Sequence, residues 1–263
     1  MKSYGKTETF LMPRTHKHKL LRMVIQVKGG TTMKHESASE RPVSESFSLA
    51  ILLTISGGFL DAYTFCCRDQ VFANAQTGNM VRVGIALAMG NFREVIRYLI
   101  PIFAFACGVY LAVSVRERFS TQKDSLWQQR VLVLEILVAG TVSFIPMKTM
   151  LNILSNILVS FLCAMQSESF RKVRGKVFNS TMCTGNLRSG TECLYRAIRK
   201  KDPSVRRDAG RYFGIILSFI LGAVTGIRIS KVLMEKAILI VALLLCCILG
   251  LLIWNRKQSS ISA

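Results

Sequence analysis

Six long runs of apolar residues constrain this chain more than any other feature of its sequence. They fall at roughly 47–67, 98–115, 131–147, 149–167, 212–230 and 237–254. Each approaches the ~20 residues that a helix needs to cross a hydrocarbon core about 30 Å thick. The segment AILIVALLLCCILGLLIW, which ends at Trp254, contains no charged residue. The sequence therefore predicts an all-α, polytopic transmembrane helix bundle and disfavours a large soluble one.

The strong positive charge of the chain follows from this topology. The formal net charge is +20, which by itself would suggest a nucleic-acid partner. The Lys and Arg residues, however, lie in the N-terminal tail and between the apolar runs, where membrane topology places them. Some of them would also attract anionic lipid. We expect the lipid bilayer as the partner and no nucleic acid.

The sequence repeats itself. The tripeptide Thr-Gly-Asn occurs at 77–79, within FANAQTGNMVRVG, and again at 184–186, within FNSTMCTGNLRSG. Each copy follows one long apolar run and precedes two more. This order predicts two tandem membrane repeats, 46–148 and 149–255, between a basic cytoplasmic tail, 1–45, and a short C-terminal tail, 256–263.

The two Thr-Gly-Asn segments, 71–90 and 178–195, are more polar than the six runs. Treating them as broken or re-entrant concentrates Lys and Arg on one side of the membrane, which favours six spans over eight. Three spans per half is an odd number, so the second half would enter the bilayer in the opposite sense. In secondary transporters, such inverted repeats place broken helices around a substrate site.

The repeated tripeptide suggests a site for chemical reasons. Glycine allows a sharp turn or a close approach of the backbone, and Thr and Asn can cap a helix that begins there. The positive end of such a helix, with Arg82 or Arg188 one turn later, would suit an anionic group. The alternative is that glycine permits tight packing while Thr and Asn bond across helices.

Two carboxylates lie at matching distances from the tripeptides. Asp61 stands inside the first apolar run, and Glu168 follows it by the same 107 residues that separate the tripeptides. Intramembrane carboxylates are costly and usually face the bundle interior or a cavity. Together they could bind a cation or relay a proton. A structural salt bridge to Arg82, Arg188 or Arg171 is the alternative.

The small-residue pattern, the cysteines and the histidines do not indicate a functional site. The small-residue pattern Gly222-Ala-Val-Thr-Gly226 is suited to close helix contact. The eight cysteines lie mostly in apolar runs and are expected to pack as small hydrophobic residues. The three histidines fall in the tail, and no nucleophile or phosphate-loop motif occurs, so we expect no metal, no cofactor and no enzyme.

The segments GGFLDAYTF, VFANAQTGNM and QSESFRKVRGKVFNSTMCTGNLRSGTE, in this order, resemble the YoaK family of bacterial membrane proteins. The resemblance covers roughly 45–255. It implies a multi-pass protein of a bacterial inner membrane with about six helices. The family is one of unknown function, so the resemblance implies no substrate.

We therefore weigh three functions: a secondary transporter or permease for a small solute, with an anion among the classes considered; a non-transporting scaffold whose repeated motifs serve packing; and a channel. The N-terminus is expected in the cytoplasm, and the oligomeric state is left open. The candidate solute or ion site comprises Asp61, Thr77, Gly78, Asn79, Arg82, Gln166, Glu168, Thr184, Gly185, Asn186 and Arg188.

Overall fold

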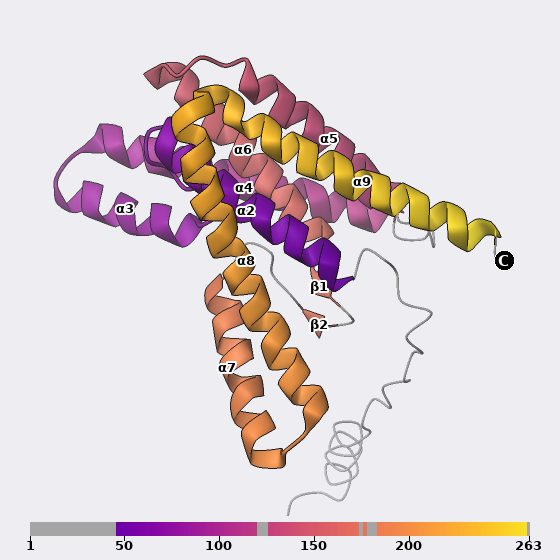
Figure 1. Cartoon of the computed structure of the whole chain (residues 1–263). Coiled ribbons are helices and arrows are strands. Elements are labelled where there is room, and N and C mark those ends of the chain that lie inside the picture. The colour runs from indigo at the N-terminus through magenta and orange to yellow at the C-terminus, as the bar shows by residue number, and fades with distance from the viewer. Residues whose placement is uncertain (1–45, 120–125, 174–175, 178–182, 262–263) are drawn as a thin grey trace, which may run out of the picture. The chain divides into compact units, whose positions relative to one another are not determined.

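The computed structural model describes residues 46–119, 126–173, 176–177 and 183–261; the predicted tail 1–45 lies outside them. The described residues are mainly helical (Figure 1). The elements in chain order are α2 Phe47–Cys67, α3 Gln76–Ala88, α4 Phe92–Phe119, α5 Leu126–Ser143, α6 Thr149–Ser169, β1 Lys172–Val173, β2 Lys176–Val177, α7 Cys183–Lys200, α8 Pro203–Leu233, η2 Met234–Ala237 and α9 Ile238–Ile261. The two strands form one short antiparallel pair.

The apolar runs become helices. Four stretches of the described chain are long and apolar enough to cross a membrane: α2, most of α4, α6, and Pro203–Trp254. The last of these contains α8 and most of α9, which η2 separates where Met234 adopts a φ of 51°. The chain is therefore a membrane protein of the all-helical class. The run 131–147 lies mostly in α5, which begins with the polar turn LWQQR and is not among the four stretches.

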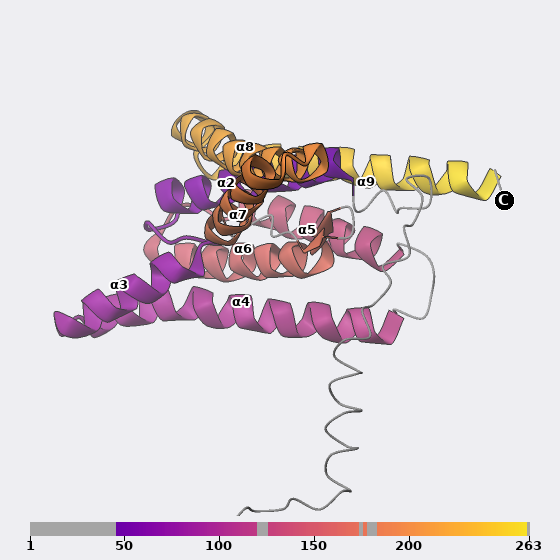
Figure 2. The ribbon, with the colours of Figure 1, turned by 90° about the horizontal axis from the view of Figure 1, so that it is seen from below.

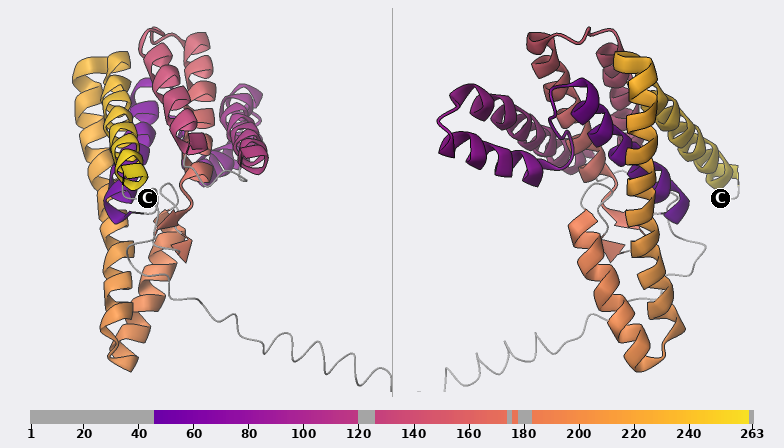
Figure 3. Two further views of the ribbon diagram at one scale, coloured as in Figure 1. Left: turned by 90° about the vertical axis from the view of Figure 1, so that its right-hand side faces the viewer. Right: turned by 60° about the vertical axis from the view of Figure 1, so that its left-hand side comes forward.

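The two Thr-Gly-Asn segments form shorter or more polar helices. Helix α3 has 13 residues, about 20 Å of helical rise, which is too short for a ~30 Å core. Helix α7 has 18 residues and is amphipathic, with polar and apolar side chains on different faces. Each forms a helical hairpin with the helix that follows it, α3 with α4 and α7 with the N-terminal part of α8 (Figures 1 and 3).

The longest contacts join helices that are far apart in sequence. Helix α2 packs along α8, and α4 packs along α6 (Figure 2). Helix α5 packs against both α9 and α6. The first helix of each sequence half thus lies against the third helix of the other half.

Glycines make these two contacts close. A Cβ atom at Gly222 would overlap the backbone carbonyl of Ile55, and one at Gly226 would lie 2.9 Å from Cα of Phe59. In the other pair, a Cβ atom at Gly108 would lie 3.3 Å from Cα of Phe161. The packing role predicted for Gly222 and Gly226 is confirmed: both let α8 approach the backbone of α2.

Arg68 ends α2 and is fully buried. Its guanidinium donates to the Tyr63 hydroxyl at 2.9 and 3.1 Å and to Asn152 Oδ1 at 3.0 Å. It also donates to three carbonyls at the C-terminal end of α5 and just after it, those of Val142, Ile145 and Pro146. The backbone carbonyl of Arg68 accepts from Asn156 Nδ2 at 2.8 Å. One side chain therefore joins the end of α2, the end of α5 and the start of α6.

We expect Gly222→Ala to lower the free energy of unfolding by about 1–3 kcal/mol, because the added methyl meets backbone rather than a flexible side chain. Gly250→Ala in α9 is the matched control, since nothing lies within 4 Å of its Cβ position. Thermal unfolding in detergent measures both. Equal melting temperatures for the two variants would contradict the close packing of α2 and α8.

Arg68→Met should destabilise the protein by about 3 kcal/mol or more, because it leaves several buried acceptors without a donor. Arg97→Met is the control, because its pair with Glu94 is partly exposed and such pairs contribute about 0–1 kcal/mol. Monodispersity by size-exclusion chromatography and the melting temperature report the difference. An Arg68→Met protein as stable as Arg97→Met would show that the buried guanidinium is dispensable.

Candidate functional site

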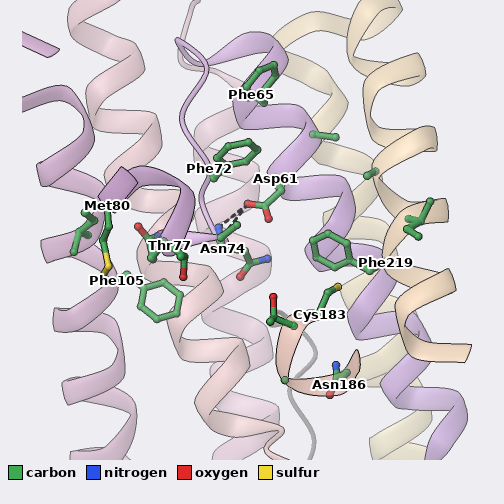
Figure 4. A pocket seen from close by; sticks show the side chains of 18 of the residues that line it. Asp61, Phe65, Phe72, Asn74, Thr77, Met80, Phe105, Cys183, Asn186 and Phe219 are labelled. Atoms are coloured by element: carbon green, nitrogen blue, oxygen red, sulfur yellow. Dashed lines mark hydrogen bonds between the residues drawn. The ribbon is translucent and has the colours of Figure 1, made fainter. Parts of the chain in front are cut away.

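A cavity of about 1400 Å³ opens between α2, α3, α4, α7 and α8. Its wall is mostly apolar, and four phenylalanines, Phe65, Phe72, Phe105 and Phe219, take part in it. In Figure 4, Asp61 and Asn74 lie below Phe65 and above Cys183 and Asn186. Polar groups from two distant parts of the chain therefore face one apolar space.

The two tripeptides meet at this cavity. Thr77 lines it from the first turn of α3, and Thr184, Gly185 and Asn186 line it from the first turn of α7. The prediction that a helix begins at each tripeptide is confirmed. Five of the eleven predicted site residues, these four and Asp61, line the same cavity.

Asp61 organises the segment that leads into α3. Its Oδ1 atom accepts from the backbone N–H of Asn74 at 2.7 Å and from that of Ala75 at 3.3 Å. Ala75 is the N-cap residue of α3, and the helix has no capping hydrogen bond from an N-cap side chain. The expected capping by Thr77 is thus replaced by a carboxylate from α2, which sits where the positive end of α3 favours an anion.

Gly78 and Asn79 support the cavity wall from behind. Asn79 is fully buried, and it accepts from Phe72 N at 3.1 Å and donates to Phe72 O at 2.6 Å. A Cβ atom at Gly78 would lie 2.9 Å from the Phe72 ring, whereas Gly185 has open space. The two glycines therefore differ: only Gly78 is required by a close contact.

The two arginines are placed differently. The Arg82 guanidinium lies 5.4 Å from the ring centre of Phe65 and 5.6 Å from that of Phe72, and it donates to the Tyr98 hydroxyl at 3.0 Å. It contacts rings of the cavity wall without lining the cavity itself. Arg188 is exposed on α7 and does not line the cavity.

Gln166 and Glu168 lie outside the cavity lining. Glu168, near the end of α6, forms ion pairs with Arg116 of α4 and with Arg171 at 3.2 Å. Gln166 is fully buried, and its Nε2 atom lies 3.5 Å from Glu135 Oε2. The structural salt bridge weighed for Glu168 is therefore present, with Arg171 and additionally with Arg116.

A difference in loop length explains why Glu168 does not pair with Asp61. Helices α2 and α6 both have 21 residues and end 102 residues apart, at Cys67 and Ser169. The tripeptides are 107 residues apart because the segment between α6 and α7 is longer. Aligning the two helices end to end places Cys163, not Glu168, at the position of Asp61.

Three features escaped the sequence analysis, two at the cavity and one outside it. Asn74 lines the cavity, is 3% exposed, and its Oδ1 atom has no hydrogen-bond partner among the described residues. Glu135 is 1% exposed inside α5. Its position within an apolar run was the available signal, the same one that pointed to Asp61. The phenylalanines gave no signal, because such residues are equally common in ordinary apolar packing.

Comparisons with known proteins agree with the membrane class. Residues 49–251 match the family model described as "Protein of unknown function (DUF1275)". The chain is 27% identical over 186 residues to a UPF0700 transmembrane protein, YoaK, of Bacillus subtilis (strain 168); the match covers 67% of this chain and 80% of that protein. No solved structure matches.

Asp61→Ala should lower the free energy of unfolding by about 1–3 kcal/mol, because two buried N–H groups lose their acceptor. Asp61→Asn keeps an acceptor oxygen in place and should cost clearly less. Melting temperatures in detergent compare the two, with Glu94→Ala as a partly exposed acidic control. Equal losses for Ala and Asn would mean that the charge, rather than the hydrogen bonds, stabilises this segment.

Proposed function

The chain belongs to the DUF1275 family of proteins of unknown function, and on this premise and its own geometry we propose that it is a multi-pass carrier of a small organic solute. One observation carries the proposal: two copies of one tripeptide, 107 residues apart, begin two helices at a single cavity. Helix starts around a cavity inside a membrane protein are the arrangement that secondary transporters use to bind their substrates.

We further propose that 46–148 and 149–255 are inverted repeats with six crossings in all, in a bacterial inner membrane. The N-terminus would lie in the cytoplasm. A match in packing supports the repeat: Gly226 meets the backbone of Phe59, and Gly108 meets the backbone of Phe161. Phe161 follows Phe59 by the same 102 residues that separate the ends of α2 and α6.

The directions of the first helices support the inversion. Asn156, two turns into α6, donates to the carbonyl of Arg68 at the end of α2. The end of α2 therefore lies beside the start of α6, and Figure 1 shows the two helices running in opposite senses. Equivalent helices of opposite direction are what an inverted repeat requires.

The cavity lining favours a cation over an anion. Among the described residues that line it, Asp61 is the one charged side chain. The positive end of α3 is already occupied by that carboxylate. Aromatic faces attract organic cations, and four phenylalanines take part in the cavity wall. We therefore propose a compact organic cation with an apolar body.

A pair of permanently charged aryl probes tests this proposal: phenyltrimethylammonium as the cation and benzenesulfonate as the anion. We expect the cation to raise the melting temperature of the purified protein and to enter proteoliposomes that contain it. Asp61→Asn should weaken cation binding about tenfold or more, because a carboxylate and the quaternary nitrogen interact in an apolar space.

Glu94→Gln, which alters a partly exposed acid outside the cavity lining, should bind and transport the cation as the wild type does. Binding without uptake would contradict a carrier and support a scaffold. If the protein binds benzenesulfonate and Asp61→Asn leaves that binding unchanged, the result would contradict a cationic solute and favour an anionic one. A saturable flux would separate a carrier from a channel.

A further inference from the structure

A buried carboxyl outside the cavity has an incomplete set of hydrogen bonds. Glu135 of α5 is 1% exposed and Gln166 of α6 is fully buried. One contact joins them, from Gln166 Nε2 to Glu135 Oε2 at 3.5 Å. Among the described residues, neither Glu135 Oε1 nor Gln166 Oε1 has a hydrogen-bond partner. Two oxygens that can only accept are thus buried in one place without a donor.

A single hydrogen would complete this pair. A protonated carboxyl carries one O–H donor, and a primary amide offers one acceptor oxygen and an N–H donor. With a hydrogen on Glu135 Oε1, that hydroxyl can donate to Gln166 Oε1 while Gln166 Nε2 donates to Glu135 Oε2. Such a cyclic acid–amide pair leaves neither oxygen unpartnered, which buried polar groups generally require.

No neighbouring group takes the place of this hydrogen. Within the described part of the chain, Glu135 has no ion pair. From α6 the titratable neighbour is Cys163, which is close to both Glu135 and Asp61 of α2. On α5 itself the nearest charge is Arg130, five residues earlier, or about 7.5 Å of helical rise.

In the part of the chain that the structure describes, the other helices around α5 bring no ion-pair partner to Glu135. Arg116 of α4 is paired with Glu168. Helix α9 contributes apolar side chains to the core that surrounds α5, among them Leu245 and Ile248. The acid of η2, Glu235, lies near the C-terminal end of α5. Its backbone carbonyl accepts from the Tyr63 hydroxyl, which also accepts from Arg68. Arg68 in turn donates to the carbonyl of Val142, near that end of α5.

We propose that Glu135 and Gln166 form a proton-binding site, and that this proton is the coupling ion of the carrier; the second clause rests on the function proposed above. The step is a simple equilibrium in which the Glu135 carboxylate gains one proton from water and loses it to water again. Cys163 interacts electrostatically with both Glu135 and Asp61, and Asp61 lines the cavity, so the occupancy of one site can influence the other through charge.

Infrared spectroscopy of the purified full chain tests the proton site without any solute. The wild type should show the C=O stretching band of a protonated carboxylic acid at neutral pH, and Glu135→Gln should lose it. Glu168→Gln should retain it, since that acid is ion-paired. Should Glu135→Gln fail to fold, Gln166→Leu should shift the frequency of the band, because its amide partner is gone. A band unchanged in these variants overturns the proton site.

Proteoliposomes test the coupling, with phenyltrimethylammonium as the probe and an imposed pH gradient of either sign. We expect gradient-driven accumulation in the wild type and at least a tenfold loss in Glu135→Gln, with cation binding retained. Accumulation that survives in Glu135→Gln overturns the coupling role. No wild-type uptake at all, together with the band lost in Glu135→Gln, would overturn the carrier while supporting the proton site.

Discussion

The fold depends on the close backbone contact between helices of different sequence halves. Gly226 and Gly222 bring α8 against α2, and Gly108 brings α4 against α6. In a membrane, helices gain little from the hydrophobic effect against one another, so close van der Waals packing at small residues has to hold them together. Because each contact crosses between halves, neither half can form its packing alone.

This exchange of helices also determines where the cavity lies. Helix α3 forms a hairpin with α4, and α7 forms one with α8. Bringing α8 against α2 therefore carries the start of α7 to the side of Asp61, opposite the start of α3 (Figure 4). The two sides are chemically unequal: a carboxylate meets the segment before α3, whereas α6 has Cys163 at the position equivalent to Asp61. The described cavity lining therefore contains one acid, which lies on its α2 side.

The sequence predicted the features that depend on local residue pattern or on the high free energy of burying a charge. Apolar length identified the helices, the tripeptide marked the start of α3 and α7, and an acid inside an apolar run marked Asp61. The predicted alignment of Asp61 with Glu168 was wrong. The 107-residue offset of the tripeptides does not hold for α2 and α6, because the segment before α7 is longer than the segment before α3. Which of the aromatic side chains face the cavity depends on helix rotation, which apolar runs without a polar face do not specify.

Arg68 and Glu135 show how burial alone fails to separate structural from functional charge. Both are almost completely inaccessible. Arg68 donates to a hydroxyl, an amide oxygen and three carbonyls. Its fixed charge is therefore compensated by hydrogen bonds, and the side chain joins three helix ends. Glu135 has one long contact and one oxygen without a partner. A group surrounded by that little compensation is easier to neutralise than to keep charged, and a carboxyl, unlike a guanidinium, can do so by taking up a proton. The hydrogen bonds of Arg68 suit a permanent structural role, whereas the surroundings of Glu135 suit a site whose protonation changes.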